Sequence, residues 1–195
     1  LGGEVLPIKV AGLKASCYTF GHRILRQNKK KTVNGFANYN KWLRSNLVQI
    51  NPEIRKESLE KQLNSKAEGL NAHLVEDPDL LGTVMNLMEN PLVICGNFDK
   101  SFLNLPSEIL ITVMRIHQKY FSVTNNDGVL LPKFLAVIDS NEKYSDQIRI
   151  GHERVLKARL SDATFFWSTD LKITLESRVK LLKKIVFQEN LGTMF

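Results

Sequence analysis

The stretch from residue 148 to residue 167 constrains the fold most, because its apolar side chains recur with the period of an α-helix. Wound as a helix, the stretch places these apolar side chains on one arc: Ile148, Val155, Leu156, Leu160, Ala163, Phe166 and Trp167. His152 and Arg159 project into the same arc. A buried guanidinium is costly unless it is paired, and Asp162 lies within its reach on a helix. The pattern therefore predicts a core-facing helix in which Arg159 and Asp162 form a structural anchor; a direct functional contact of Arg159 is the alternative.

The chain has the composition of a globular protein with an excess of positive charge. Its 195 residues can bury a core as one large domain or two small ones. Hydrophobic residues make up 43% and charged residues 24%, which does not indicate disorder. The net charge of +7 favours a polyanionic partner such as nucleic acid. No apolar run is long enough to span a bilayer and no signal peptide opens the chain, so we expect no membrane association. Cys17 and Cys95 are far apart in the sequence, which favours a reduced, cytoplasmic location.

The two ends suggest a larger protein. The chain begins at Leu1 without methionine and stops directly after a basic amphipathic segment. We therefore expect it to be a piece of a longer polypeptide. An active site could lie outside these residues.

The remaining hydrophobic patterns predict an α+β fold. Helices are expected over these ranges: 36–47, 52–67, 76–91, 106–119, 145–170 and 174–187. Strands are expected over these ranges: 3–10, two within 11–31, 92–95, 120–123 and 135–138. Asn51 would cap the second helix, with Pro52 at its first position, and residues 125–128 would form a turn between the last two strands. Helix 174–187 would pack back on helix 145–170 as a hairpin.

The densest basic run of the sequence lies near its N-terminal end. It contains His22, Arg23, Arg26, Lys29, Lys30 and Lys31. A solvated loop is one interpretation. The other is a contact with a phosphate backbone, where lysines and arginines gain free energy by releasing condensed counterions.

The sequence contains no familiar catalytic motif. The segment MRIHQKYF concentrates Arg115, His117 and Tyr120 at a helix-to-strand junction, a kind of place that often carries sites. No second His, Cys or carboxylate stands at ligand spacing from His117, and Cys17 and Cys95 lack the spacing of a zinc site. P-loop, GxGxxG, GxSxG and HExxH motifs are absent. We therefore predict no catalytic residue and no metal.

Several segments follow one another as they do in a known family. They are MRIHQKYF, LPKFLAVID, GHERVLKARLSDATFFWSTDLK and RVKLLKKIVFQENLGTM, preceded by GGEVLPIKVAGLKASCYTFGHRIL. Together they resemble the β subunit of bacterial heterotetrameric glycyl-tRNA synthetase. The resemblance covers almost the whole chain, is weakest over 28–74, and corresponds to a fraction of that long subunit. His152 departs from the family pattern, which has an asparagine after Gly151, so no special role is assigned to it.

This resemblance implies a division of labour between two subunits. In that family the α subunit holds ATP, glycine and the adenylation site, while the β subunit binds and positions tRNA(Gly) in an α2β2 complex. Residues 1–144 would form a B3/B4-like α+β domain with a mixed sheet and packed helices. Residues 145–195 would be the first helices of an all-α HD-like domain. Since no adjacent His-Asp pair occurs, no metal, no cofactor and no complete active site are expected in this chain.

On this interpretation the expected tRNA contacts are cations on the surface. They are Arg23, Lys29, Lys30, Lys31, Arg154 and Lys157, the last two facing away from the apolar arc. Two alternatives stay open: hydrolytic editing of mischarged tRNA, and a purely structural module for assembly of the α and β subunits. Editing is less needed for glycine, because a pocket that excludes side chains already rejects larger amino acids.

Overall fold

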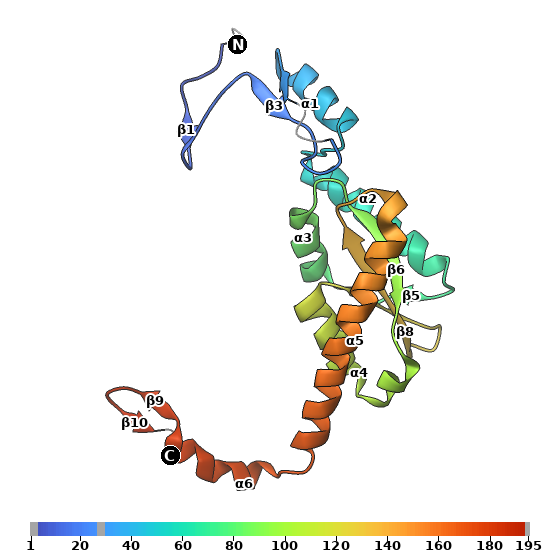
Figure 1. The fold of residues 1–195 in the computed structure, drawn as a ribbon, viewed down its shortest axis with the longest axis vertical. Coiled ribbons are helices and arrows are strands. Elements are labelled where there is room, and N and C mark those ends of the chain that lie inside the picture. Colours follow the sequence, from blue (N-terminus) through green and yellow to red (C-terminus); the bar gives the residue numbers. More distant parts are fainter. Residues whose placement is uncertain (1–3, 27–29, 194–195) are drawn as a thin grey trace.

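The computed structural model describes residues 4–26 and 30–193, which form an α+β fold (Figure 1). Its centre is a sheet with the strand order β5-β7-β8-β6. The strands are β5 (His73–Leu74), β6 (Leu92–Asn97), β7 (Phe121–Thr124) and β8 (Leu130–Ile138). Strands β6 and β7 do not pair with each other, because β8 lies between them and is antiparallel to both. The predicted α+β class is confirmed, whereas the expectation of a mixed sheet is wrong, since every pairing in this sheet is antiparallel.

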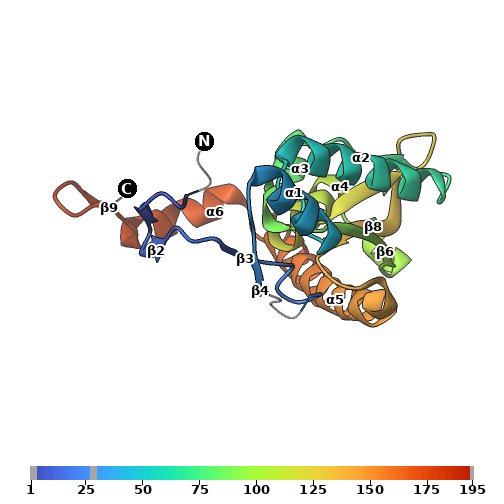
Figure 2. The same cartoon turned by 90° about the horizontal axis from the view of Figure 1, so that it is seen from above.

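Helices cover both faces of the sheet (Figure 2). They are α2 (Pro52–Glu68) and α3 (Pro78–Leu87) on one face, and α4 (Ser107–Thr112), its π-helical continuation (Val113–Gln118) and α5 (Ser145–Asp170) on the other. Because successive side chains of a strand point to opposite faces, Leu135 and Val137 of β8 pack with α2 and α3. Phe134 and Ala136 pack with α4 and α5. The sheet therefore carries two separate hydrophobic cores, one on each face.

Local signals set the ends of several elements. The Asn51 Oδ1 atom accepts hydrogen bonds from the backbone N–H groups of Glu53 (2.9 Å) and Ile54 (3.3 Å), and Pro52 opens the helix. Gly128 has a φ of +77° in the turn that joins β7 to β8, a conformation that glycine adopts without strain. The predicted cap of α2 and the predicted turn are both confirmed.

Helix α5 has the predicted bounds, but its buried stripe is narrower than expected. Leu156 and Leu160 are fully buried, and they are flanked by partly buried residues at Ile148, His152 and Ala163. Ile148, His152, Leu156 and Leu160 form one i, i+4 ridge of the helix, and Ala163 extends the buried stripe three residues after Leu160. The neighbouring ridge is exposed and contains Val155, Arg159, Asp162 and Phe166. The prediction that Arg159 projects into the buried face is therefore wrong, because only one ridge of α5 meets the sheet.

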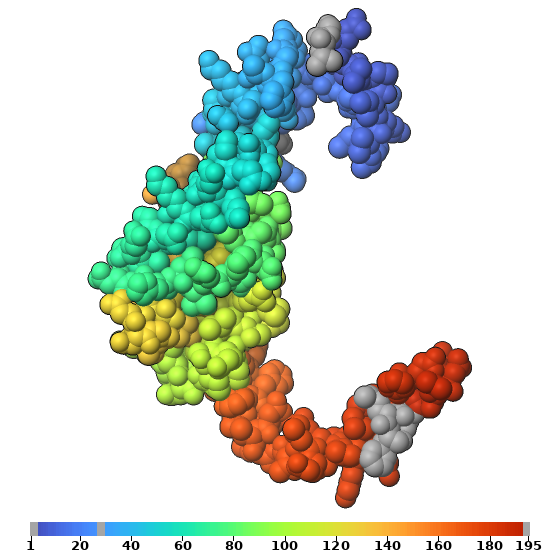
Figure 3. Space-filling view, turned by 180° about the vertical axis from the view of Figure 1, so that it is seen from behind, coloured from blue at the N-terminus to red at the C-terminus, as the bar shows by residue number. Residues whose placement is uncertain are grey.

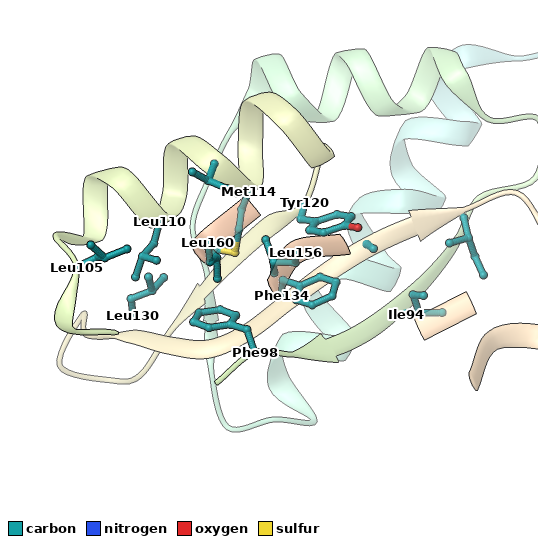
Figure 4. Packing of buried hydrophobic residues seen from close by; sticks show 13 residues of the cluster. Ile94, Phe98, Leu105, Leu110, Met114, Tyr120, Leu130, Phe134, Leu156 and Leu160 are labelled. Atoms are coloured by element: carbon teal, nitrogen blue, oxygen red, sulfur yellow. The ribbon is translucent and has the colours of Figure 1, made fainter. Parts of the chain in front are cut away.

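Helix α5 belongs to the same packed unit as the sheet. Figure 4 shows Leu156 beside the ring of Phe134, and Leu160 near Met114. Buried residues of α5 thus share one hydrophobic cluster with the sheet, and the domain boundary expected between residues 144 and 145 stays a prediction. The HD-like nature of the helical continuation stays a prediction.

The segment after α5 leaves the core instead of folding back. It contains α6 (Leu175–Val179), a 3₁₀-helix (Lys180–Lys184) and the hairpin of β9 (Val186–Gln188) and β10 (Gly192–Thr193). Figures 1 and 3 show this segment extending away from the end of α5. Leu175 is 81% exposed. The predicted packing of helix 174–187 against α5 is therefore wrong, and the helix itself is shorter than expected.

The N-terminal part forms two small hairpins and a helix at the other end of the core (Figure 1). Its elements are β1 (Lys9–Val10), β2 (Leu13–Lys14), β3 (Tyr18–Phe20), β4 (Lys30–Thr32) and α1 (Phe36–Ser45). The strand expected over 3–10 is described only over Lys9–Val10. Short 3₁₀-helices at Lys100–Asn104 and Glu142–Tyr144 complete the connections in the core.

Candidate nucleic-acid interface

A buried histidine joins the N-terminal part to the end of the sheet. His22 is 1% exposed, and its Nε2 atom lies 2.7 Å from Oδ1 of Asp139, directly after β8. Its Nδ1 atom accepts the backbone N–H groups of Ile24 (3.2 Å) and Leu25 (3.1 Å). Nδ1 therefore carries no proton, and Nε2 donates to Asp139. The prediction that His22 belongs to an exposed basic run is wrong, because both of its ring nitrogens make hydrogen bonds within the fold.

Asp139 ties a third segment into this junction. Its carboxylate accepts the backbone N–H groups of Glu89 (3.3 Å) and Asn90 (3.1 Å), just before β6. One carboxylate thus fixes the start of β6, the end of β8 and the turn that contains His22. The turn that holds Arg23 is fixed relative to the sheet by this contact.

The exposed cations of the basic run follow this fixed point. Arg23 is exposed in the turn after His22. Lys30 and Lys31 are exposed on β4, whose register with β3 places Lys31 opposite Thr19. The Nζ atom of Lys30 lies 3.9 Å from the centroid of the Tyr18 ring, a cation–π contact. Lys29 lies outside the described residues.

The second group of expected contacts lies on α5. Arg154 and Lys157 are exposed, as the helical spacing predicts. Neither takes part in an ion pair of the described residues, whereas Arg149 on the same helix pairs with Glu153 (3.0 Å). Arg154 and Lys157 are therefore not neutralised by a carboxylate at contact distance.

The expected anchor of Arg159 and Asp162 is not formed. Both side chains are exposed, and the ion pairs found among residues 4–26 and 30–193 do not include one between them. His152 takes the polar place on the buried ridge instead. The buried ridge of α5 therefore contains an imidazole rather than a guanidinium, so no permanent charge is buried there.

His152 bonds to a tyrosine that sequence reasoning did not connect with it. The Tyr120 hydroxyl lies 2.5 Å from Nδ1 of His152, and the Tyr120 ring stacks on Phe134 with centroids 4.4 Å apart. Burial raises the pKa of Tyr120 to about 12 and lowers the pKa of His152. Both groups are neutral at pH 7, so the hydroxyl donates to the imidazole. The pair packs the core and offers no activated nucleophile.

The helix-to-strand junction of MRIHQKYF is also structural. Both guanidinium contacts of Arg115 with Asp77 are hydrogen bonds, and they hold the pKa of Asp77 below its usual range. Asp77 in turn caps α3 by accepting the N–H group of Leu80 (2.9 Å). His117 is exposed. In the part of the chain that is described, no three His, Cys, Asp or Glu side chains gather as a metal site would require, and the absence of a metal stays a prediction.

The fold and the exposed cations define a basic α+β protein, and none of its described helices is long and apolar enough to cross a membrane. The chain belongs to the glycyl-tRNA synthetase beta subunit family, whose family model matches residues 1–195. The family interpretation of the sequence is therefore confirmed.

Individual relatives agree with the family match. The chain is 43% identical over 193 residues to the glycine–tRNA ligase beta subunit of Listeria monocytogenes serotype 4b (strain CLIP80459). It is 43% identical to that of Listeria welshimeri and 40% identical to that of Moorella thermoacetica. Each match covers 99% of this chain and 28% of the relative. The chain thus spans about 28% of the length of these relatives.

Proposed function

We propose that this chain is part of a glycine–tRNA ligase β subunit and that it binds and positions tRNA(Gly) for ATP-dependent aminoacylation. ATP, glycine and the adenylation site would belong to the α subunit of an α2β2 complex, in the cytoplasm. The observation that carries the proposal is the set of exposed cations held on defined elements: Arg23, Lys30 and Lys31 at the N-terminal part, and Arg154 and Lys157 on α5.

The mechanism is electrostatic and positional. Each lysine or arginine that meets a phosphate releases condensed counterions, which favours binding without reading sequence. Elements anchored to the sheet hold those contacts in one register, so that the 3′ end of the tRNA can be delivered to a distant adenylate. Arg154 and Lys157 support this role because α5 is fixed to the core by its opposite ridge.

Hydrolytic editing gains no support from the two histidines that are buried or partly buried. Both ring nitrogens of His22 make hydrogen bonds within the fold, and His152 is bonded to Tyr120 inside the core. Neither histidine is therefore placed as an accessible general base.

Assembly with the remainder of the enzyme is the second candidate function. The segment beyond the core exposes large apolar side chains, among them Leu171, Leu175, Phe187 and Leu191. Exposed apolar surface of this kind is typical of an interaction site. A structural role for this segment is compatible with RNA binding by the core.

The experiment measures binding of tRNA(Gly) to the full chain by fluorescence anisotropy over a range of salt concentrations. Double charge reversal, Arg154→Glu with Lys157→Glu, should weaken binding and lower the salt slope by about one for each lost phosphate contact. The matched control is Lys61→Glu with Lys66→Glu on the exposed side of α2. Equal binding by both double variants would remove Arg154 and Lys157 from the interface. A deacylation assay with mischarged tRNA runs beside it, and turnover would favour editing.

A further inference from the structure

The hairpin of β3 and β4 exposes one face that carries two aromatic rings. Tyr18 and Phe20 are two residues apart on β3, so their side chains point to the same face of the strand. Tyr18 is 49% exposed and Phe20 is 51% exposed, whereas Thr19, on the opposite face, is half-buried. Neither ring belongs to the two hydrophobic clusters of the central sheet. Both rings can therefore meet a partner molecule.

A lysine from β4 shares this face with the two rings. The register places Lys30 directly opposite Phe20, and residues directly opposite each other on paired strands point to the same face. The Nζ atom of Lys30 reaches across to the Tyr18 ring and lies 3.9 Å from its centroid. Lys30 is absent from the ion pairs found among residues 4–26 and 30–193. The face thus presents a cation that one ring orients, and a second ring, Phe20, for which the described residues show no ring contact.

The end of β3 is fixed to the rest of the molecule directly after Phe20. Gly21 is buried and lies so close to α1 that an added Cβ atom would be 2.8 Å from Cβ of Asn46. The backbone N–H group of His22 donates to the carbonyl oxygen of Asn46 at 3.0 Å, and its Nε2 atom donates to Asp139. Phe20 stands two residues before this buried junction, so its backbone is held although its ring is exposed.

The combination of rings and a cation on this face favours RNA over protein as its partner. Lysine is depleted in the core of protein–protein interfaces. Surfaces that bind single-stranded nucleic acids combine aromatic rings, on which bases stack, with cations that contact the backbone. Lys31 on β4 and Arg23 in the turn after β3 add exposed positive charge to the same part of the chain.

We propose that this face of the β3–β4 hairpin binds an unpaired base of an RNA strand, which stacks on the ring of Phe20. Lys30 contacts the phosphate of that nucleotide, and Tyr18 is a positioning residue that orients the Lys30 ammonium group. Because every base has a π-face, the contact selects an unpaired nucleotide and not a particular base. This inference rests on the proposed function for tRNA as the RNA, and it adds a contact with a base to the contacts with phosphates.

The first experiment separates stacking from charge. Fluorescence anisotropy compares binding of the full chain to a single-stranded oligoadenylate of about eight nucleotides and to the same sugar–phosphate strand without bases. Phe20→Leu should weaken binding of the oligoadenylate by about tenfold, because one stacked base is lost, and should leave binding of the abasic strand unchanged. Phe20→Trp keeps a flat ring and should bind the oligoadenylate as the parent chain does. Lys30→Gln should weaken binding of both strands, since both carry phosphates.

The matched control for this experiment is Phe36→Leu, which removes a ring that is 72% exposed at the start of α1. This variant should bind both strands as the parent chain does. Equal affinities of Phe20→Leu and Phe36→Leu for the oligoadenylate would overturn the proposal, and the exposed face would then be assigned to a protein partner. An equal loss of Phe20→Leu on both strands would also overturn it, because the ring would not be contacting a base.

The second experiment repeats the comparison with tRNA(Gly). Phe20→Leu should weaken binding without changing the salt slope, because no phosphate contact is lost, whereas Lys30→Gln should lower the slope by about one. If tRNA binds Phe20→Leu as tightly as the parent chain, the stacking contact is refuted while the proposed function stands. If the chain binds the oligoadenylate through Phe20 but does not bind tRNA, the proposed function fails and the stacking site stands.

Discussion

Replacing Gly96 by alanine should destabilise the protein, although glycine is usually the less favourable residue in a strand. Gly96 lies in β6 directly opposite Phe134 of β8. A Cβ atom added there would lie 2.2 Å from Cζ, 2.6 Å from Cε1 and 2.9 Å from Cε2 of the Phe134 ring. The ring therefore crosses the backbone of Gly96, in the space that a side chain would need.

The size of the effect follows from how tightly that ring is held. Phe134 is 0% exposed, stacks on Tyr120 with ring centroids 4.4 Å apart, and packs in the same cluster as Leu156 and Leu160. These contacts oppose displacement of the ring, so overpacking should cost about 1–3 kcal/mol. The lower entropy of the unfolded alanine chain offsets about 0.4–1 kcal/mol. The 2.2 Å approach places the overpacking cost in the upper part of its range, so we expect a net loss of about 1–2 kcal/mol from the free energy of unfolding.

Urea denaturation followed by circular dichroism measures this change. The matched control is Gly151→Ala on α5, where no atom lies within 4 Å of the added Cβ. The free energy of unfolding of that variant should be higher by about 0.5–1 kcal/mol, because glycine inside a helix is unfavourable. The double variant Gly96→Ala with Phe134→Leu should lose less unfolding free energy than the sum of the losses of the two single variants, because the added Cβ atom no longer meets the ring. Our reasoning fails if Gly96→Ala is as stable as the parent chain.

Three further predictions concern α5 and the His22 junction. Burial lowers the pKa of His152 below the usual value of a histidine, so the unfolded chain binds the proton first as the pH falls. The free energy of unfolding should therefore decrease as the pH drops from about 7 to about 5, and His152→Gln should flatten that slope in urea titrations. His22→Ala should cost about 1.5–3 kcal/mol by removing the bond to Asp139 and should increase proteolysis of the N-terminal part, and unchanged cleavage would contradict the junction. Leu156→Ala should lower the unfolding free energy by about 2–5 kcal/mol, while Val155→Ala, on the exposed side of α5, should change it by less than about 0.5 kcal/mol. Similar losses in the two variants would mean that the buried stripe of α5 is wider than described.

Features encoded within a few residues could be predicted. The cap at Asn51, the turn at 125–128 and the bounds of α5 depend on side chains and backbone preferences within one or two turns. The outward position of Arg154 and Lys157 follows from the same helical period. That part of the candidate interface needed no knowledge of the fold.

Features that depend on distant partners could not be predicted. By its sequence His22 is one more cation of a basic run, and its burial depends on Asp139, 117 residues further on, which accepts a hydrogen bond from its Nε2 atom. The same holds for Tyr120 and His152, which meet across 32 residues. The face that Phe20 and Lys30 share depends on the register of β3 with β4, which the alternation of side chains along one strand does not determine.

The sequence by itself determined the family, the excess of positive charge and the bounds of α5, because each is carried by residue identity or by a short-range period. The tertiary structure decided that β8 would lie between β6 and β7, which ridge of α5 would be buried, and that residues 174–187 would leave the core. A helical period marks a broad apolar arc. Only the surface packed against the helix selects the ridge, and here the sheet covers Leu156 and Leu160 while leaving Arg159 in solvent.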